Sequence, residues 1–446
     1  MKIVIVGAGE IGGYLARMLT QEQHDIVIID ANPEPLRRVS ETLDVLTLEG
    51  SATRLNVLQK AGVGQADMLI AVTSSEEVNF AACMLAAKLG VRKKIMRVRD
   101  PEFLLAEGPA SAAAFGIDLV IYPEGIAAME IVRLIRRSAA TEVLDLADGR
   151  MQLLGLKVDP ESPLIGKKLE DIPQPKEGFS YRVVCILRGV QTIIPKHDSI
   201  IRRGDQIFVI SRTETVPAML EVCGKSAANL GKIMILGGGE VGQWVARELE
   251  DEVEIKLIES SLERSHKLAT SLRKTLVLHD EGKDLDMLAS EGIMRMDAYI
   301  AVSPDEEGNI ISCLMAKHLG VKKTVSLVDK VDYIPFSNAI GVDALINKKL
   351  SAANAILKFI RRGEIVTAAT LHGVGAEIIE LIAQPGSRIT KKPVGELGFP
   401  DGARIGCILH GNNVFIPVRT SQVQPQDRVV VFTLPKAIHD VERLFR

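Results

Sequence analysis

The sequence is poor in aromatic residues, which make up only 4% of its 446 residues. Its cores must therefore be built from aliphatic side chains, and such aliphatic runs are typical of parallel strands covered by helices. No segment approaches the roughly 20 consecutive apolar residues that span a bilayer. The formal net charge of −3 lacks the basic excess of a nucleic-acid-binding protein, so nucleic acid is not expected as a partner.

Cysteine is also scarce, with five residues in the whole chain. No two of them form a CxxC pair, and an odd number without such spacing argues against a disulfide framework or a zinc site. We expect buried, free cysteines and no bound metal. The largely apolar residues 1–6 run straight into a glycine-rich turn without a cleavage-type site, so they predict a strand rather than a signal sequence, and a cytoplasmic location.

What the chain does contain is a duplication. The matching blocks are residues 3–12 (IVIVGAGEIG) with 233–242 (IMILGGGEVG), 67–79 (DMLIAVTSSEEVN) with 297–309 (DAYIAVSPDEEGN), and 183–189 (VVCILRG) with 405–411 (IGCILHG). The first two pairs are separated by the same number of positions, which indicates no insertion between them. The order of units is therefore A1–B1–A2–B2, a gene duplication rather than a stacked array of small repeats.

The A units alternate apolar strands with helical patterns. In the first unit we expect strands near residues 2–6, 26–30, 45–48, 68–72, 94–98 and 119–121. This alternation predicts an α/β protein with two doubly wound parallel-sheet, Rossmann-like domains. The B units have short alternating runs and Gly- and Pro-rich turns, which indicate small β-rich domains.

The expected boundaries follow from these patterns. Nucleotide-binding domains span residues 1–125 and 230–350, connector helices span 126–140 and 351–363, and small C-terminal domains span 141–225 and 364–446. The first connector is apolar over a wide face, so it should pack on another element. Docking on another copy of the A unit and an ordinary place in an intramolecular core both fit this pattern.

The glycines of the first A unit carry the clearest chemical signal. Gly7-x-Gly9-x-x-Gly12 follows a predicted strand directly and opens a predicted helix, which is the context of a dinucleotide-binding fingerprint. Gly7 permits the tight turn, Gly9 removes the Cβ that would block a pyrophosphate, and Gly12 allows close packing of helix and strand. The N–H groups and the positive dipole end of that helix favour phosphates.

An acidic residue, Asp30, closes the second predicted strand. A carboxylate there accepts the hydroxyls of the adenosine ribose, and no adjacent arginine is present to hold a 2′-phosphate. The sequence therefore favours NAD(H) over NADP(H). ADP or ATP remains an alternative because each shares the same adenosine and phosphate groups.

Further polar residues follow other strands at the edge where open α/β sheets bind ligands. Thr73 and Ser74 follow the fourth strand, Ser51 and Thr53 follow the third, and Arg97 lies near the end of the fifth. Ribose or phosphate contacts are one interpretation. The alternatives are helix N-capping for the hydroxyl residues and a surface ion pair for Arg97.

The second A unit keeps a similar pattern. Its candidate residues are Gly237, Gly238, Gly239, Glu240, Val241 and Gly242, with Glu259 closing the second strand. It departs from the first unit where Ser74 becomes Pro304 and Arg97 becomes Leu327. We expect this second site to bind nucleotide more weakly, or to bind a different nucleotide.

Taken together, these motifs resemble the TrkA family, the regulatory NAD-binding subunits of bacterial and archaeal Trk potassium transporters. The family's opening motif stands at Ile3–Ala16 with Asp30, its AVTSSDExN signature at Ala71–Asn79, and its C-terminal ending at Asp440–Phe445. The resemblance covers essentially the whole chain. It implies two RCK (KTN) nucleotide-binding domains, each followed by a small α+β RCK C-terminal domain.

The resemblance also implies residue roles and partners. The implied nucleotide contacts are Gly7, Ala8, Gly9, Glu10, Ile11, Asp30, Thr73, Ser74 and Arg97. The implied assembly is a tetramer forming an eight-unit ring, held at the inner face of the membrane by a TrkH-like potassium-conducting subunit. The implied function is a regulatory, non-enzymatic one.

Two other functions compete with a nucleotide-gated regulator. An NAD-dependent oxidoreductase needs an acid or base beside the nicotinamide, and none of the eight histidines falls at a strand end facing the first glycine loop. A structural assembly protein would use the nucleotide only for stability, without a change of shape.

Overall fold

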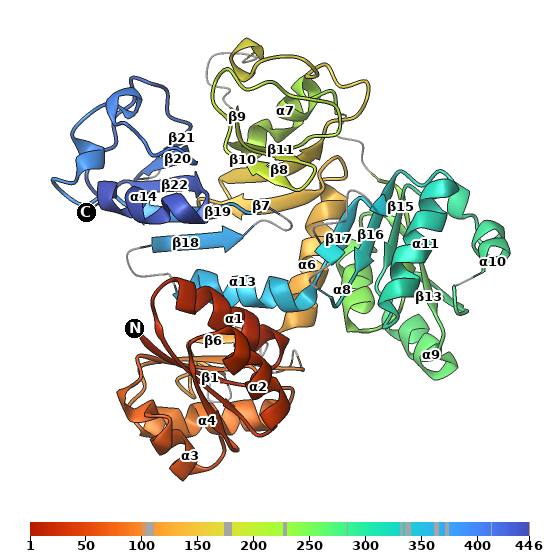
Figure 1. Ribbon diagram of the computed structural model, residues 1–446. Helices are drawn as coiled ribbons and strands as arrows, with labels where there is room; N and C mark the ends of the chain where they lie inside the picture. The colour runs from red at the N-terminus through yellow and green to blue at the C-terminus, as the bar shows by residue number, and fades with distance from the viewer. Residues whose placement is uncertain are drawn as a thin grey trace. The chain divides into compact units, whose positions relative to one another are not determined.

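The computed structural model describes residues 1–100, 102, 111–173, 181–225, 230–282, 284–330, 333–334, 340–360, 365–370, 374–411 and 413–445. It confirms the predicted fold class, because two six-stranded parallel sheets each precede a five-stranded sheet (Figure 1). The expected end of the second connector, residues 361–363, lies outside the described residues. Within the described part of the chain, no helix is long and apolar enough to cross a membrane.

The first parallel sheet has the strand order β3-β2-β1-β4-β5-β6. Its strands are β1 (Lys2–Val6), β2 (Asp25–Asp30), β3 (Leu46–Glu49), β4 (Met68–Ala71), β5 (Lys93–Arg97) and β6 (Leu119–Ile121). Its helices are α1 (Glu10–Gln21), α2 (Pro33–Thr42), α3 (Leu55–Lys60) and α4 (Glu76–Lys88). The strand order reverses between β1 and β4, which is where open α/β sheets bind their ligands.

Local sequence explains these elements. Residues 3–6 of β1 are aliphatic and fully buried, as expected for a central strand covered on both faces. In α1, Ile11, Leu15 and Leu19 recur at helical spacing and are buried against the sheet. The central strand and α1 thus share a buried aliphatic layer.

The second parallel sheet repeats this order as β14-β13-β12-β15-β16-β17. Its strands are β12 (Lys232–Leu236), β13 (Glu254–Glu259), β14 (Leu276–His279), β15 (Ala298–Ala301), β16 (Lys323–Leu327) and β17 (Ala344–Ile346). Its helices are α8 (Glu240–Leu249), α9 (Leu262–Ser271), α10 (Leu285–Ser290) and α11 (Glu306–His318).

Strand register shows that the expectation of no insertion between the matching blocks was wrong. Lys2 pairs with Asp25, whereas Lys232 pairs with Glu254, so the second copy is shorter by a single position between its first two strands. The original spacing returns at β14, which begins at Leu276 where β3 begins at Leu46. A single-position deletion is thus compensated by a single-position insertion between the matching blocks.

The two small domains are built on antiparallel sheets of equivalent topology, β10-β9-β11-β8-β7 and β21-β20-β22-β19-β18. The first has β7 (Glu142–Leu146), β8 (Met151–Lys157), β9 (Tyr181–Arg188), β10 (Gln191–Ile193), β11 (Gln206–Arg212) and α7 (Val216–Val222). The second has β18 (Ile365–Thr370), β19 (Glu377–Ile382), β20 (Ala403–His410), β21 (Asn413–Phe415), β22 (Arg428–Thr433) and α14 (Ile438–Phe445).

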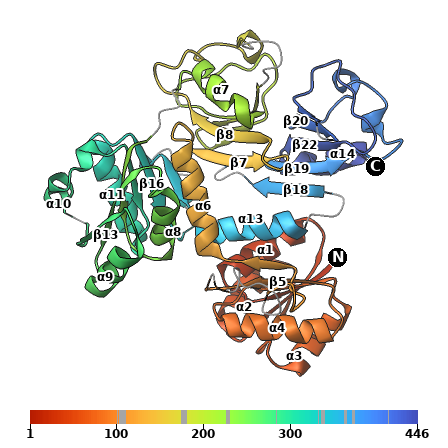
Figure 2. The same cartoon turned by 180° about the vertical axis from the view of Figure 1, so that it is seen from behind.

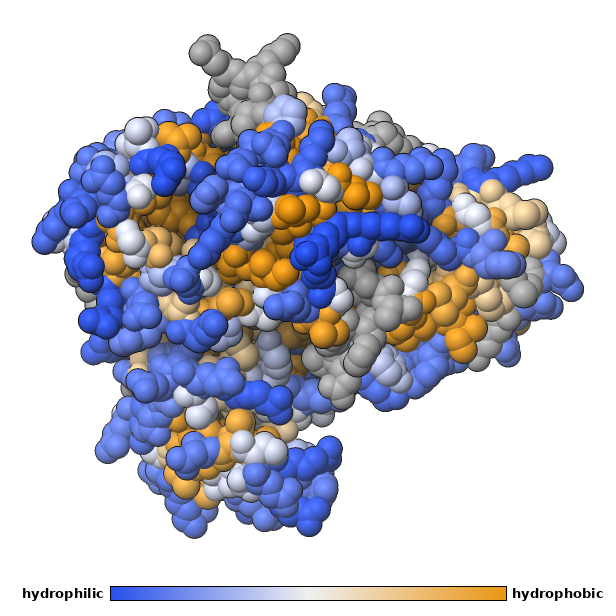
Figure 3. Space-filling view, turned by 45° about the horizontal axis from the view of Figure 1, so that its top comes forward, coloured by the Kyte–Doolittle hydropathy of each residue, from blue (hydrophilic) through white to orange (hydrophobic). Residues whose placement is uncertain are grey.

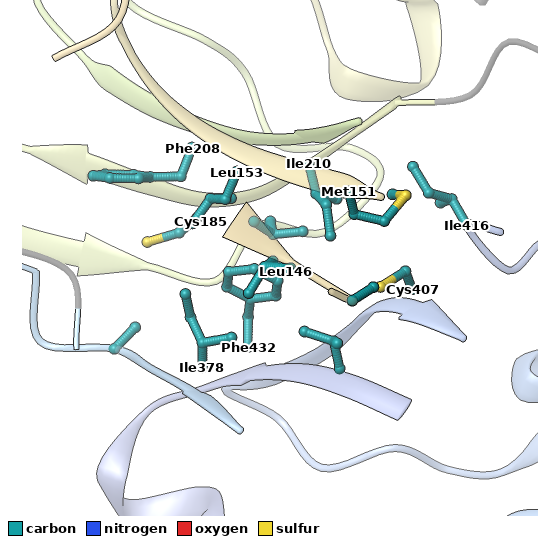
Figure 4. Close-up of a cluster of buried hydrophobic side chains, with 14 of the residues drawn as sticks. Leu146, Met151, Leu153, Cys185, Phe208, Ile210, Ile378, Cys407, Ile416 and Phe432 are labelled. Carbon is teal, nitrogen blue, oxygen red and sulfur yellow. The ribbon is translucent and has the colours of Figure 1, made fainter. Parts of the chain in front are cut away.

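The two small sheets share one apolar core. Phe208 and Cys185 from the first sheet and Phe432 and Cys407 from the second belong to the same buried cluster (Figure 4). Arg182 adds hydrogen bonds from its guanidinium to the carbonyl oxygens of the second small domain. Burying aliphatic and aromatic surface is worth about 25 cal/mol per Å², so this cluster holds the two domains as a pair.

All five cysteines are free and buried, as predicted. Burial raises the pKa of Cys83 and of Cys185 to about 12, because the thiolate is disfavoured away from water. Thiols of this kind are poor nucleophiles and poor metal ligands. Among the described residues, no cluster of His, Cys, Asp and Glu is arranged to hold a metal ion.

The connector helices are α6 (Pro123–Arg136) and α13 (Lys348–Ile360), each beginning slightly before the apolar stretch used to predict it. The chain divides into two compact units, residues 1–127 with 347–359 and residues 128–346 with 360–446. Helix α13 follows the second parallel sheet in sequence but belongs to the unit of the first, where it lies beside α1 (Figures 1 and 2).

Most of α6 follows the first parallel sheet in sequence but belongs to the unit of the second. From Ala128 onward it belongs to the unit of the second parallel sheet, where Arg136 binds Glu252, after α8, at 2.6 Å. Its apolar residues Ile131, Val132 and Ile135 are buried within this unit, so α6 lies in an intramolecular core to which the second A unit of the same chain contributes. On the face drawn in Figure 3, separate apolar patches lie among hydrophilic side chains.

Lys323 is an unusual buried cation at the start of β16. Its side chain donates to the carbonyl oxygen of Ala140, which follows α6, and the residue is 4% exposed. Burial lowers the pKa of its ammonium from 10.5 to about 8, an effect that nearby Asp343 partly offsets. Burial of a charged ammonium away from water therefore destabilises the folded state at neutral pH.

This shift predicts a specific pH dependence. Between about pH 8 and 10.5 the folded chain binds fewer protons at Lys323 than the unfolded chain, so the free energy of unfolding rises with pH, by about 3 kcal/mol in all. Lys323→Met removes this contribution. Denaturant unfolding of both proteins from pH 7 to 10.5 should show their stability difference changing by that amount. Parallel stability curves would contradict the assignment.

Candidate functional site

The glycine loop between β1 and α1 is shaped by backbone contacts. Gly7 has φ of +107°, and a Cβ there would lie 3.0 Å from the amide nitrogen of Thr73. A Cβ on Gly12 would lie 1.9 Å from the carbonyl oxygen of Gly7, so only glycine lets the helix approach this closely. A Cβ on Gly9 would meet no atom of the described residues within 4 Å, which leaves open space in front of the loop.

Helix α1 begins at Glu10 without a capping side chain from the described residues, because its N-cap residue is Gly9. The neighbouring helices differ, since Asn32 caps α2 and Ser75 caps α4 through side-chain oxygens. The first turn of α1, from Glu10 and Ile11 onward, thus keeps its N–H groups clear of any N-cap side chain. An uncapped first turn facing open space is suited to a phosphate group.

Asp30 ends β2 beside this loop. Its Oδ2 accepts the N–H of Ala8 at 2.6 Å and its Oδ1 accepts the N–H of Asn32 at 2.9 Å. Each carboxylate oxygen has two acceptor positions, so one position on each oxygen stays available to a ribose hydroxyl. The carboxylate therefore both fixes the loop and presents acceptors at its mouth.

Thr73 follows β4 at the other side of the crevice. Its hydroxyl donates to Oδ1 of Asn79 at 2.7 Å and accepts the N–H of Ser75, so its single proton is used within the loop. The N-cap of α4 is Ser75, and the alternative that Thr73 or Ser74 caps this helix is wrong. Ser74 is exposed beside them.

Asn79 is a residue whose role the sequence reasoning missed. It is 1% exposed, and its side chain donates to the carbonyl oxygens of Thr73 and Arg97 while accepting the N–H of Thr73. It thereby joins the ends of β4 and β5. The signal was present in the duplication, because Asn309 stands at the matching position of the second copy and makes the equivalent bonds to Ser303 and Leu327.

Arg97 ends β5 on the same edge of the sheet. Its Nε is buried without a hydrogen-bond partner in the described residues. Burial lowers the pKa of its guanidinium, while the nearby charge of Glu124 acts to raise it. The described part of the chain contains no ion pair to Arg97, so it gives no support to the alternative of a surface ion pair, and the buried Nε–H has no acceptor there.

Ser51 and Thr53 lie in the loop after β3. Their hydroxyls bond to each other at 2.8 Å, and neither caps α3, whose N-cap is Arg54. The N-capping alternative is therefore wrong for both. The loop is tied to the crevice because the N–H of Gly50 donates to the carbonyl oxygen of Asp30 at 2.8 Å.

The second glycine loop has the same geometry. Gly237 has φ of +104°, a Cβ on Gly242 would lie 2.0 Å from the carbonyl oxygen of Gly237, and a Cβ on Gly239 would meet no described atom within 4 Å. Helix α8, which begins with Glu240 and Val241, also has no side-chain cap from the part of the chain that is described. Both copies thus keep an uncapped helix start facing open space.

The acidic residue differs between the copies. Glu259 is 3% exposed, and its carboxylate accepts the N–H groups of Gly238 at 2.9 Å and Ser261 at 2.7 Å. A Cβ on residue 238 would lie 2.3 Å from Cδ1 of Leu268 and 3.0 Å from Oε2 of Glu259, so glycine at this position leaves room for both side chains. Arg264 lies 3.4 Å from the same carboxylate, so the second crevice has a different charge pattern.

The sequence-predicted residues of each copy thus gather at the carboxyl edge of one sheet. Two domain families match the chain, the TrkA-N domain over residues 3–123 and 233–348 and the TrkA-C domain over residues 153–224 and 378–446. The chain is 34% identical over 451 residues to the Trk system potassium uptake protein TrkA of Halomonas elongata, covering 100% of this chain and 99% of that protein. This chain belongs to the TrkA family.

Other TrkA relatives span the same length. A TrkA homolog from Methanosarcina mazei is 34% identical over 457 residues, with full coverage of both chains. Among solved structures, the GsuK channel bound to NAD has a TM-score of 0.62 at 18% identity and covers 100% of this chain and 78% of that one. The GsuK RCK domain has a TM-score of 0.61, at 18% identity and with 100% and 94% coverage, and shows that the two proteins share a fold.

Proposed function

We propose that this chain is the cytoplasmic regulatory subunit of a potassium transport system, and that it binds NAD(H) or an adenine nucleotide at the first glycine loop. The observation that carries the proposal is the crevice between β1 and β4. There, an uncapped helix start, the acceptor positions of Asp30 and the Nε of Arg97, which has no partner among the described residues, lie at one sheet edge. Phosphate and ribose require these complementary groups.

The family supports the transport role. Relatives that match over the whole length are named as potassium uptake proteins, and the GsuK channel of similar fold has been solved with NAD and with ADP. We infer that the conducting pathway belongs to a separate, TrkH-like membrane subunit. Tandem units in four copies would form an eight-unit ring beneath it.

Regulation requires that the nucleotide binds two conformations with different affinity, because equal binding shifts no equilibrium. A coupling of about 1–3 kcal/mol is typical of such systems. We further propose that the second crevice takes a nucleotide more weakly than the first, or takes a different one, because Leu327 replaces Arg97 and Glu259 is buried.

Potassium flux tests this function directly. The chain is reconstituted with its membrane subunit, and flux is measured with NADH, NAD, ADP and ATP. At least one nucleotide should change the flux. In Asp30→Asn, which keeps the shape of the side chain but removes its charge and replaces one acceptor oxygen by a donor NH2 group, the affinity for that nucleotide should fall about tenfold. A potassium flux that is the same with and without each of the four nucleotides would contradict a regulatory role.

A further inference from the structure

The start of helix α13 lies at the first glycine loop. Nζ of Lys349 is 2.5 Å from Oε2 of Glu10, the first residue of α1. At the other end of α13, the ring centroid of Phe359 lies 5.9 Å from Nζ of Lys93, which begins β5. The helix therefore runs with its first turn at the carboxyl edge of the first sheet, and Figures 1 and 2 show it beside α1.

This helix start is held in place. Asn347 is fully buried, and its Oδ1 accepts the N–H groups of Lys349 at 3.1 Å and Leu350 at 2.9 Å. The side chain of Lys349 is 25% exposed, whereas that of Glu10 is 62% exposed. The ammonium is thus partly desolvated by its surroundings, while its carboxylate partner remains largely in water and free to turn away.

A second cation at this edge also points to an anionic ligand. The buried Nε of Arg97 has no partner in the described residues, and Arg97 ends β5. In the sheet order β1-β4-β5, Arg97 ends β5, which lies beyond β4. Lys349 contacts Glu10, the first residue of the helix that follows β1. Both cations therefore lie towards the edge of the sheet that carries the first glycine loop.

The lysine is specific to the second connector. Helix α6 begins two residues after β6, and its second residue is Glu124. Helix α13 begins two residues after β17, and its second residue is Lys349. The equivalent position thus carries opposite charges in the two halves, and the first crevice is the one that receives the cation.

We propose that Lys349, supplied by the second half of the chain, is a phosphate-binding residue of the first nucleotide site. This inference rests on the proposed function. The ligand class is an adenine nucleotide with a diphosphate or longer phosphate chain, since adenosine alone offers no anion. On binding, a phosphate oxygen competes with Glu10 for the ammonium, and charge-assisted hydrogen bonds of this kind are the strong ones.

The composite site also gives α13 a role in regulation. The segment that carries Lys349 leads from β17 of the second sheet towards β18 of the second small domain. A phosphate bound by both α1 and Lys349 stabilises those arrangements in which α13 stays docked. Occupancy of the first crevice is thereby linked to the position of an element from the second half.

The test uses opposite predictions for the two partners of one ion pair. Affinities for ADP and adenosine are measured by calorimetry on the full chain with Gly239→Ala, which closes the second crevice to phosphate. Lys349→Gln should weaken ADP binding about tenfold, whereas Glu10→Gln should tighten it about two- to threefold by removing a competing charge. Lys349→Arg should keep most of the affinity, and adenosine binding should be the same in all.

If the ion pair only docks α13, removal of either partner loosens that docking, and Lys349→Gln and Glu10→Gln should shift ADP affinity in the same direction. That result, or unchanged ADP affinity in Lys349→Gln, would overturn the role of Lys349 while leaving the proposed function in place. Absence of ADP, ATP and NADH binding by the unmodified chain would overturn the proposed function, and this inference with it.

Discussion

Gly9→Ala is expected to weaken nucleotide binding at the first crevice strongly while leaving the fold intact. Gly9 has φ of −65° and ψ of −172°, which alanine adopts without strain, and its Cβ would meet no described protein atom within 4 Å. The methyl group instead occupies the space in which a pyrophosphate approaches the loop. We expect an affinity loss of about 100-fold, equivalent to about 2.7 kcal/mol.

Calorimetry with NADH and ADP measures this loss, and a thermal unfolding curve unchanged from that of the parent protein shows that the fold is kept. Gly239→Ala is the matched variant in the second copy, with φ of −67° and equally open space. It should remove only binding that belongs to the second crevice. Full nucleotide affinity in a doubly substituted protein would show that neither glycine loop holds the ligand.

Gly12→Ala is expected to have the opposite profile, with a large loss of stability. Its Cβ would lie 1.9 Å from the carbonyl oxygen of Gly7, so α1 must move away from β1. Overpacking against a backbone atom in a rigid layer costs about 3 kcal/mol or more. Nucleotide binding should be lost together with the packing, because the helix start that receives the phosphate moves.

The adjacent glycine provides the control. A Cβ on Gly13 would lie 3.6 Å from Cγ2 of Val39, an ordinary contact, so Gly13→Ala should stabilise the helix by about 0.5–1 kcal/mol. Trp244 is the single tryptophan of the chain and lies in α8 of the second half. In Gly12→Ala, the unfolding transition followed by Trp244 fluorescence should therefore keep its midpoint, while the transition followed by circular dichroism moves to a lower temperature. An equal shift of both midpoints would argue against a local effect.

Much of the candidate site was predictable because its chemistry depends on short-range sequence. Strand and helix periodicity places the glycine loop, the acidic residues Asp30 and Glu259 at the strand ends, and Arg97. The partners of Thr73 were not predictable in the same way. Its hydroxyl was expected to meet a ligand or cap a helix, but it bonds to Asn79, and only the packed loop decides which of several nearby acceptors it takes.

The sequence by itself determined the duplication, the parallel sheets, the buried cysteines and the two uncapped helix starts, because each depends on residue type and spacing within one unit. Tertiary structure alone decided that the connector helices are exchanged between the halves. It also brought Lys349 to Glu10, although the two residues lie in different halves of the sequence. Ala353, Ile356 and Leu357 of α13 are buried, but which surface buries them depends on the shapes of two folded units, and no local pattern encodes that choice.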